Sequence, residues 1–253
     1  MHFKWYIDII LAIVAFIAAI VDTLAGGGGL ITLPALLLSG VNPLFALGTV
    51  KFQASVAEFS ATMYFLIKSK INYTVLSWLF VYTVVCSSIG VISLKCVPIM
   101  ILEKIVPFLL LFVLIYYISM LRRKNIRFNS ALTVNHKKFL ILGSIIGFYN
   151  GFFGPGTGSI WAIALMKAFK IDLQKATMYA KPLNFMGNLA ALIVFLLNHD
   201  VIIQLAICMS IASFFGARVG GKIVIYKDIR ILKITFLMMM IISVLATFIK
   251  YYL

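Results

Sequence analysis

The stretch DTLAGGGGLITLP, residues 22–34, decides the fold of this chain, and NGFFGPGTGS, residues 150–159, is the matching stretch in its second half. Four consecutive glycines make a poor helix interior, because each costs about 1 kcal/mol relative to alanine. Pro155 lacks a backbone N–H and stops the preceding helix in a similar way. Both stretches are therefore predicted to end one helix and begin another, with non-helical backbone between.

The chain around these two breaks is too apolar for a soluble protein. Of its 253 residues, 63% are hydrophobic and 11% are charged, whereas soluble domains are about 45–50% apolar and about 25% charged. So few charges cannot cover a water-facing surface. The sequence predicts an all-α polytopic membrane protein and excludes long soluble domains.

Apolar runs divide the chain into ten predicted segments, two of which are short. The segments are 5–24, 30–40, 44–67, 74–94, 105–121, 139–153, 158–169, 173–197, 201–216 and 231–250. A helix of a dozen residues is about 18 Å long, whereas the hydrocarbon core is about 30 Å thick. The sequence thus predicts about eight transmembrane helices, together with glycine-rich broken or re-entrant half-helices at 30–40 and 158–169.

The distribution of charge predicts an orientation in the membrane. Lys and Arg number 22 against 7 Asp and Glu, and the basic residues lie between apolar runs, which argues against nucleic-acid binding. Residues 122–138 form a basic loop without any acid, and such loops are typical of the cytoplasmic side. Alternation of the spans then places both termini on the outer side.

An internal repeat covers the chain. Gly28 matches Gly158 and Lys51 matches Lys181, each pair 130 positions apart. Each half contains an odd number of segments, so the second half enters the membrane from the opposite face, as in transporters built from inverted repeats. We therefore predict a first repeat at 1–121, a cytoplasmic loop at 122–138 and a second repeat at 139–253.

The glycine-rich breaks are candidates for a binding site. Free N–H groups and the positive end of a helix favour an anion, and glycine lets a ligand approach the main chain closely. Close helix packing is the alternative explanation. The predicted substrate-binding glycines are Gly26, Gly27, Gly28, Gly29, Gly154, Gly156 and Gly158.

Ionisable residues inside the predicted spans are a second indication of a site. A charge at the bilayer centre costs about 2.5–3.5 kcal/mol, so such residues usually face a cavity or one another. Lys51 and Lys181 occupy equivalent repeat positions and, if they converge, would favour a small anion between them. The alternative is that both side chains reach to the membrane surface. Thr49 and Asn184 could add hydrogen bonds to an oxyanion.

Two carboxylates occur in only one half. Asp22 and Glu58 correspond to Asn150 and Asn188 in the repeat, so only the first half could carry a proton for coupled transport. Asp22 and Glu58 are therefore the proton-coupling candidates. Glu58 also lies two helical turns from Lys51, which makes a structural ion pair between them an equal alternative.

Other chemistry finds little support in the sequence. None of the three histidines pairs with a nucleophile or acid at a useful spacing, and the cysteines show no CxxC motif. No enzyme activity, cofactor or metal site is therefore predicted. Gly216 is expected to interrupt the helix at 201–216, leaving Arg218 as a cytoplasmic anchor.

The sequence resembles a known family at these same motifs. AGGGGLITLPAL (25–36) and ALGTVK (46–51) are similar to the first-half signature of the TauE/SafE (sulfite exporter, DUF81) membrane transporters, and within that family to the YfcA-like members. GFYNGFFGPGTGS (147–159) and residues 176–188 resemble its second-half signature. One departure is MYAK (178–181), which lacks the threonine of GTVK (48–51).

The resemblance implies a transporter with two repeats of four to five helices in a bacterial inner (cell) membrane. Its motifs fall on Gly26–Gly29, Pro34, Thr49 and Lys51, and on Gly154, Gly156, Gly158, Lys181 and Asn184. Several members of the family are associated with sulfite, sulfoacetate or other sulfur-containing anions. We expect a secondary transporter (exporter or permease) of a small anion that works by alternating access.

Two alternatives remain open at the sequence level: an anion channel of the same architecture, and a membrane assembly protein without transport activity. The expected partners are a small anionic substrate and the lipid bilayer, and the sequence indicates no particular oligomeric state.

Overall fold

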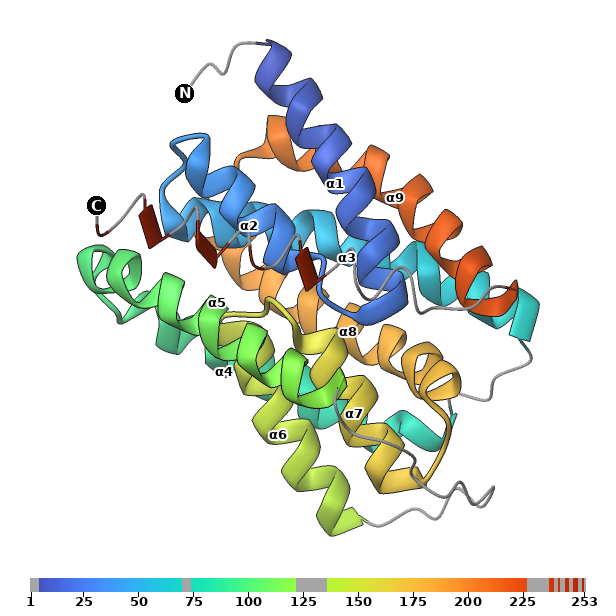
Figure 1. Cartoon of the computed structure of the whole chain (residues 1–253). Coiled ribbons are helices and arrows are strands. Elements are labelled where there is room, and N and C mark those ends of the chain that lie inside the picture. The colour runs from blue at the N-terminus through green and yellow to red at the C-terminus, as the bar shows by residue number, and fades with distance from the viewer. Residues whose placement is uncertain are drawn as a thin grey trace.

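The computed structural model describes residues 5–69, 74–121 and 136–226, and scattered positions between 237 and 252. The elements of these ranges are helices: α1 (Trp5–Ala25), α2 (Gly29–Leu38), α3 (Pro43–Ser69), the short 3-10 helix η1 (Thr74–Leu76), α4 (Ser77–Lys95), α5 (Ile99–Leu121), α6 (His136–Phe152), α7 (Thr157–Phe169), α8 (Leu173–Leu197) and α9 (Ile203–Tyr226) (Figure 1). The predicted segment 231–250 and most of the predicted loop 122–138 lie outside the described ranges.

The helices fit a membrane-embedded protein. Among the described residues, α1, α4, α8 and α9 are each long and apolar enough to cross a bilayer. By contrast, α2 has 10 residues and α7 has 13, so at about 1.5 Å per residue neither can span a core about 30 Å thick. The prediction of a short helix after each glycine-rich break is confirmed, and the total of about eight spans stays a prediction.

Several predicted boundaries are wrong. Helix α5 begins at Ile99 rather than 105, and α6 begins at His136, inside the predicted loop. Helix α9 continues through Gly216 to Tyr226. The expectation that Gly216 interrupts this helix fails because the residue serves packing instead: a Cβ there would collide with the backbone oxygen of Phe16 in α1.

Two pairs of helices pack closely through small residues. Helix α1 lies along α9, and α4 lies along α6. At the second contact, a Cβ on Gly151 of α6 would strike the backbone of Ser87 in α4. Small residues at such positions let helix backbones approach closely inside a membrane. In each pair, the first helix of one half packs against the fourth helix of the other half.

The centre of the molecule is built from α3 and α8, which cross each other. Helix α3 also packs against α9, and α8 packs against α4 and α7. Helices α1, α3 and α4 thus make their largest contacts with helices of residues 136–226. As a result, α3 and α8, which carry the predicted site lysines, meet in the interior of the protein.

Candidate functional site

The two glycine-rich breaks touch each other. The backbone N–H of Ser159 donates a hydrogen bond to the carbonyl of Gly26 at 3.1 Å, and the Ser159 hydroxyl donates to the carbonyl of Ala25. A Cβ on Gly26 would collide with the backbone of Gly158, and Gly26 has a φ of +76°. The prediction that both stretches are non-helical backbone between two helices is confirmed.

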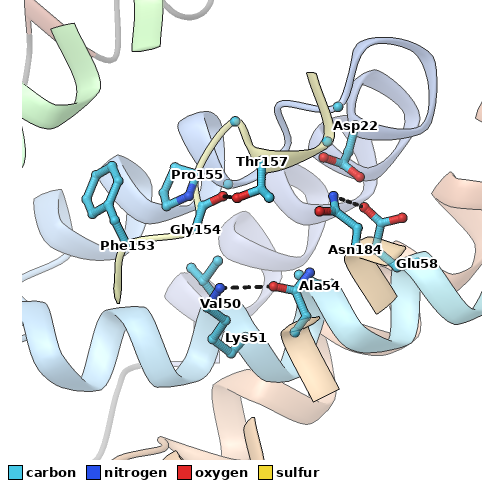
Figure 2. Close-up of a pocket in the computed structure, with 15 residues that line it drawn as sticks. Asp22, Val50, Lys51, Ala54, Glu58, Phe153, Gly154, Pro155, Thr157 and Asn184 are labelled. Carbon is cyan, nitrogen blue, oxygen red and sulfur yellow. Dashed lines mark hydrogen bonds between the residues drawn. The ribbon is translucent and has the colours of Figure 1, made fainter. Parts of the chain in front are cut away.

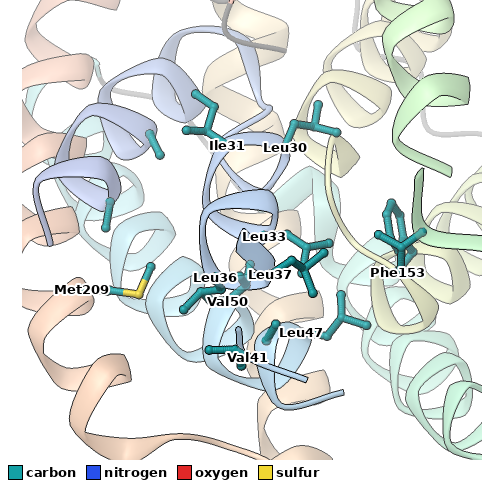
Figure 3. Close-up of a cluster of buried hydrophobic side chains, with 14 of the residues drawn as sticks. Leu30, Ile31, Leu33, Leu36, Leu37, Val41, Leu47, Val50, Phe153 and Met209 are labelled. Carbon is teal, nitrogen blue, oxygen red and sulfur yellow. The ribbon is translucent and has the colours of Figure 1, made fainter. Parts of the chain in front are cut away.

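Helix α2 is held at this place by a hydrophobic cluster. Its Leu30, Leu33, Leu36 and Leu37 are buried among residues of α1, α3, α5, α8 and α9 and beside Phe153 from the other break (Figure 3). Non-helical backbone at membrane depth is tolerated only where protein or a polar cavity surrounds it. This cluster therefore fixes the start of α2 against the second break.

A small pocket lies where the breaks meet, and its cavity volume is about 30 Å³. This is room for on the order of two water molecules. Both α2 and α7 begin at its wall, so the positive ends of two helices face it. Figure 2 shows the side chains around it. The lining residues are Asp22, Gly26, Gly29, Val50, Lys51, Ala54, Glu58, Phe153, Gly154, Pro155, Gly156, Thr157, Gly158, Asn184 and Asn188.

Lys51, from α3, forms what we call the amide site with Asn150 and Asn188. Its side chain is 2% exposed. The Nζ atom donates to the backbone carbonyl and to Oδ1 of Asn150, both at 2.5 Å, and to Oδ1 of Asn188 at 3.0 Å. Within the described part of the chain, no carboxylate lies within ion-pair distance of this Nζ. The amide site thus holds a buried ammonium with neutral oxygens alone.

Lys181, from α8, forms the carboxylate site with Asp22 and Glu58. Lys181 is 1% exposed. Its Nζ lies 2.8 Å from Oδ2 of Asp22 and 3.2 Å from Oε1 of Glu58. Nζ also donates to the Asp22 carbonyl at 2.6 Å, and Asn184 donates to Oε1 of Glu58 at 3.0 Å. This lysine is fully compensated by charge.

The geometry overturns two alternatives from the sequence. Glu58 pairs with Lys181, so the suggested ion pair between Glu58 and Lys51 is wrong. Both lysines are buried, so the suggestion that they reach to the membrane surface is wrong as well. The physical reason is that each ammonium finds three oxygens in the opposite half of the chain.

The two sites have the same contact pattern. Each lysine donates to the carbonyl and side-chain oxygen of one residue and to the side-chain oxygen of a second, and both residues come from the other half. For Lys181 these residues are the acids Asp22 and Glu58. For Lys51 the corresponding positions carry amides, so the sites differ in charge and share their geometry.

Most of the predicted site residues come together, and some do not. The predicted residues that line the pocket are Asp22, Gly26, Gly29, Lys51, Glu58, Gly154, Gly156, Gly158 and Asn184. The others contribute from behind its wall: Gly28 donates its N–H to Oδ1 of Asp22 at 2.7 Å, Lys181 binds the two acids, and Gly27 accepts from the N–H of Leu30.

The sequence placed Thr49 in the binding site, but the structure places it elsewhere. It is buried away from the pocket lining, and its hydroxyl oxygen accepts a hydrogen bond from the N–H of Ile202 at 3.1 Å. Thr49 thereby ties the start of α3 to the turn between α8 and α9. Tyr179, at the matching position of α8, is not part of the pocket lining either.

The predicted site set missed Asn150, Asn188 and Thr157. Asn188 and Thr157 line the pocket, and Asn150 holds Lys51 from behind. The signal for both asparagines was present in the repeat, where they match Asp22 and Glu58. Among the described residues, no group of three His, Cys, Asp or Glu side chains comes together that could hold a metal ion.

Comparison with known proteins identifies the family. The model of the sulfite exporter TauE/SafE family matches residues 11–247. The chain belongs to the TauE/SafE family. It is 37% identical over 226 residues to a "Probable membrane transporter protein" of Haemophilus influenzae, and the match covers 86% of this chain and 85% of that relative.

Other TauE/SafE relatives agree with this assignment. "Probable membrane transporter protein YfcA" of Escherichia coli K12 is 34% identical over 229 residues, covering 88% of this chain and 83% of the relative. "Probable membrane transporter protein ORF9" of a Sinorhizobium species is 33% identical, covering 88% and 85%. No solved structure matches the chain. The sequence resemblance is confirmed, and this TauE/SafE member belongs with membrane transporters rather than enzymes.

Proposed function

We propose that this protein is a secondary transporter, exporter or permease, for a small anion, and that sulfite or an organosulfonate is its substrate. The observation that carries the proposal is the amide site. Lys51 is a buried ammonium beside a pocket, and amide and carbonyl oxygens are its hydrogen-bond acceptors. No carboxylate of the described residues lies within ion-pair distance of this ammonium, and a bound anion would supply a counter-charge in direct contact with it.

The surroundings of the pocket favour a small oxyanion. The starts of α2 and α7 both lie at its wall, and helix N-termini attract anions through their N–H groups. Gly154 lies so close to Lys51 that a Cβ would strike Nζ, so glycine is the residue that lets the main chain approach this ammonium. A cavity volume of about 30 Å³ is smaller than such an anion needs, so loading requires the helices around it to separate.

Alternating access between inverted repeats accounts for this separation. Support comes from the matching contact pattern of the two lysine sites and from half-helices that meet at the pocket, as in other transporters with broken helices. Helices α1, α3 and α9 pack together, α4, α6 and α8 pack together, and the two groups meet where α3 contacts α8. We take these two groups as the units that move against each other. The two halves of the chain cannot serve as the units, because each group contains helices of both halves.

The proposed setting is a bacterial inner membrane. The basic residues of the 122–138 segment favour the cytoplasmic side under the positive-inside rule, and alternation then leaves both termini outside. This orientation makes the pocket accessible to the cytoplasm when α8 and α9 separate at their 170–175 and 217–226 ends.

Transport measurements in proteoliposomes test the proposal. Labelled sulfite, sulfoacetate and taurine are offered to wild type, to Lys51→Ala and to the control Lys175→Ala, whose lysine is exposed on α8. We expect saturable uptake and counterflow of at least one probe, lost in Lys51→Ala and kept in Lys175→Ala. Equal uptake by wild type and Lys51→Ala contradicts the proposed site, and flux without saturation or counterflow indicates a channel.

A further inference from the structure

The pocket brings together equal numbers of basic and acidic side chains. The ionisable side chains of the two sites are the ammonium groups of Lys51 and Lys181 and the carboxylates of Asp22 and Glu58. Each ammonium has three N–H donors, and each lysine has three oxygen acceptors in hydrogen-bond range. Both lysines are therefore held as cations, and with Asp22 and Glu58 both ionised, two positive charges face two negative charges.

The two carboxylates differ in how fully they are bonded. Asp22 uses both oxygens, because Oδ1 accepts from the N–H of Gly28 at 2.7 Å and Oδ2 accepts from Lys181 at 2.8 Å. Glu58 uses one: Oε1 accepts from Lys181 and Asn184. Its other oxygen, Oε2, is buried without a hydrogen-bond partner in the described part of the chain. A buried polar atom without a partner is costly.

We infer that each transported anion enters this pocket together with one proton, and that Oε2 of Glu58 carries that proton. The inference rests on the proposed anion site. An anion beside Lys51 would leave the balanced pocket with one negative charge too many, in a setting where uncompensated charge is expensive. A proton on Oε2 restores the balance without breaking a hydrogen bond. A monoanion then crosses without net charge movement.

The neighbours of Glu58 favour this position over others. Helix α1 presents Asp22 and α8 presents Lys181, while Lys51 lies two turns away on the same helix. Helix α9 contacts α3 through neutral groups such as Ser213, and its described charged residues are exposed. Adding the proton to Asp22 would instead displace the N–H of Gly28 or the ammonium of Lys181.

A first test needs no substrate. Lys51→Met removes one positive charge from the pocket, and a bound anion would cancel one in the same way. The variant without any anion should therefore take up a proton on Glu58 at neutral pH. Infrared spectra of the purified full chain, in a detergent without ester groups, should show a protonated-carboxyl carbonyl band in Lys51→Met that is absent from wild type and from Lys51→Arg. The band should move in Lys51→Met/Glu58→Asp and stay in place in Lys51→Met/Asp22→Glu.

Either of two results overturns the inference: a folded Lys51→Met variant without the band, or a band that moves with Asp22→Glu. Circular dichroism and a thermal unfolding curve establish that the variants are folded. If Lys51→Met does not fold, Lys51→Gln serves the same purpose, since glutamine also removes the charge and keeps hydrogen-bonding capacity.

A second test measures coupling in proteoliposomes that contain a pH-sensitive dye. Methanesulfonate is the probe, because this monoanion does not titrate near neutral pH. We expect one proton to enter per anion in wild type and in the control Asp172→Asn, which replaces the partly exposed N-cap residue of α8. In Glu58→Gln, the number of protons that enter per anion transported should fall by at least tenfold.

The outcomes separate this inference from the proposed function. Methanesulfonate counterflow without proton entry in wild type overturns the coupling and leaves the anion site intact. Proton entry that survives Glu58→Gln also overturns it. Absence of any counterflow, with methanesulfonate or with the sulfur anions above, contradicts the transporter proposal, and the infrared measurement still decides whether Glu58 takes the proton.

Discussion

The amide site and the carboxylate site place a lysine in the same geometry and in opposite electrostatic surroundings. Lys181 has two carboxylates within 3.2 Å, whereas Lys51 has amide and carbonyl oxygens at similar distances. The two sites therefore share their hydrogen-bond pattern and differ in charge. The difference teaches that one lysine has carboxylates in direct contact, while the other has only neutral oxygens in contact and is the one we propose to meet a mobile counter-ion.

The largest expected effect comes from removing each lysine in turn. Lys181→Met strands two buried carboxylates, and breaking a buried ion pair in this way costs about 3–5 kcal/mol. Lys51→Met strands neutral oxygens and should cost about 1–3 kcal/mol. Thermal unfolding in detergent should thus show a clearly larger drop in Tm for Lys181→Met. Equal drops in Tm would mean that the two sites do not differ in charge compensation as described.

The next effect comes from converting the amide site into a carboxylate site. Asn150→Asp gives Lys51 an acidic partner in hydrogen-bond range, as Asp22 is for Lys181. A fixed carboxylate competes with the substrate anion and repels it, which should reduce uptake by about 100-fold. Asn150→Ser is the neutral control. Labelled sulfite uptake that is equal in Asn150→Asp and Asn150→Ser would show that the anion binds elsewhere.

A smaller effect should separate two glycines of the first break. A Cβ on Gly26 collides with the backbone of Gly158, and φ is +76°, whereas a Cβ on Gly29 meets Pro155 at 3.2 Å or more. Overpacking typically costs about 1–3 kcal/mol, so Gly26→Ala should lower Tm and uptake more than Gly29→Ala does. If both variants behave alike, contact between the two breaks does not control the site.

The smallest effect is expected at Thr49, which the sequence placed in the binding site and the structure places beside Ile202. Thr49→Val loses one hydrogen bond to a backbone N–H, worth about 1 kcal/mol. We expect a slightly lower Tm and an unchanged KM for the transported anion. A several-fold rise in KM with unchanged Tm would return Thr49 to the substrate site.

Much of the fold follows from local sequence. The glycine runs and Pro155 predicted where α1 and α6 end, because these residues disfavour helix whatever surrounds them. Helix α9 was predicted too short, since Gly216 looks like the same kind of break. Its role depends on α1, whose Phe16 carbonyl fills the space that a side chain would need. The sequence alone does not distinguish a glycine that ends a helix from a glycine that lets a neighbouring helix pack closely.

The sequence by itself determined the membrane class, the two breaks and the buried ionisable residues, because composition, helix propensity and spacing act locally or as sums along the chain. Only the tertiary structure decided which lysine meets which acid. Lys51 and Glu58 share helix α3, yet Lys51 binds Asn150 of α6 and Asn188 of α8, and Glu58 binds Asn184 of α8. Both partners in α8 lie more than a hundred positions away in the sequence. Pairing between distant side chains depends on how helices cross, and no local pattern encodes a crossing.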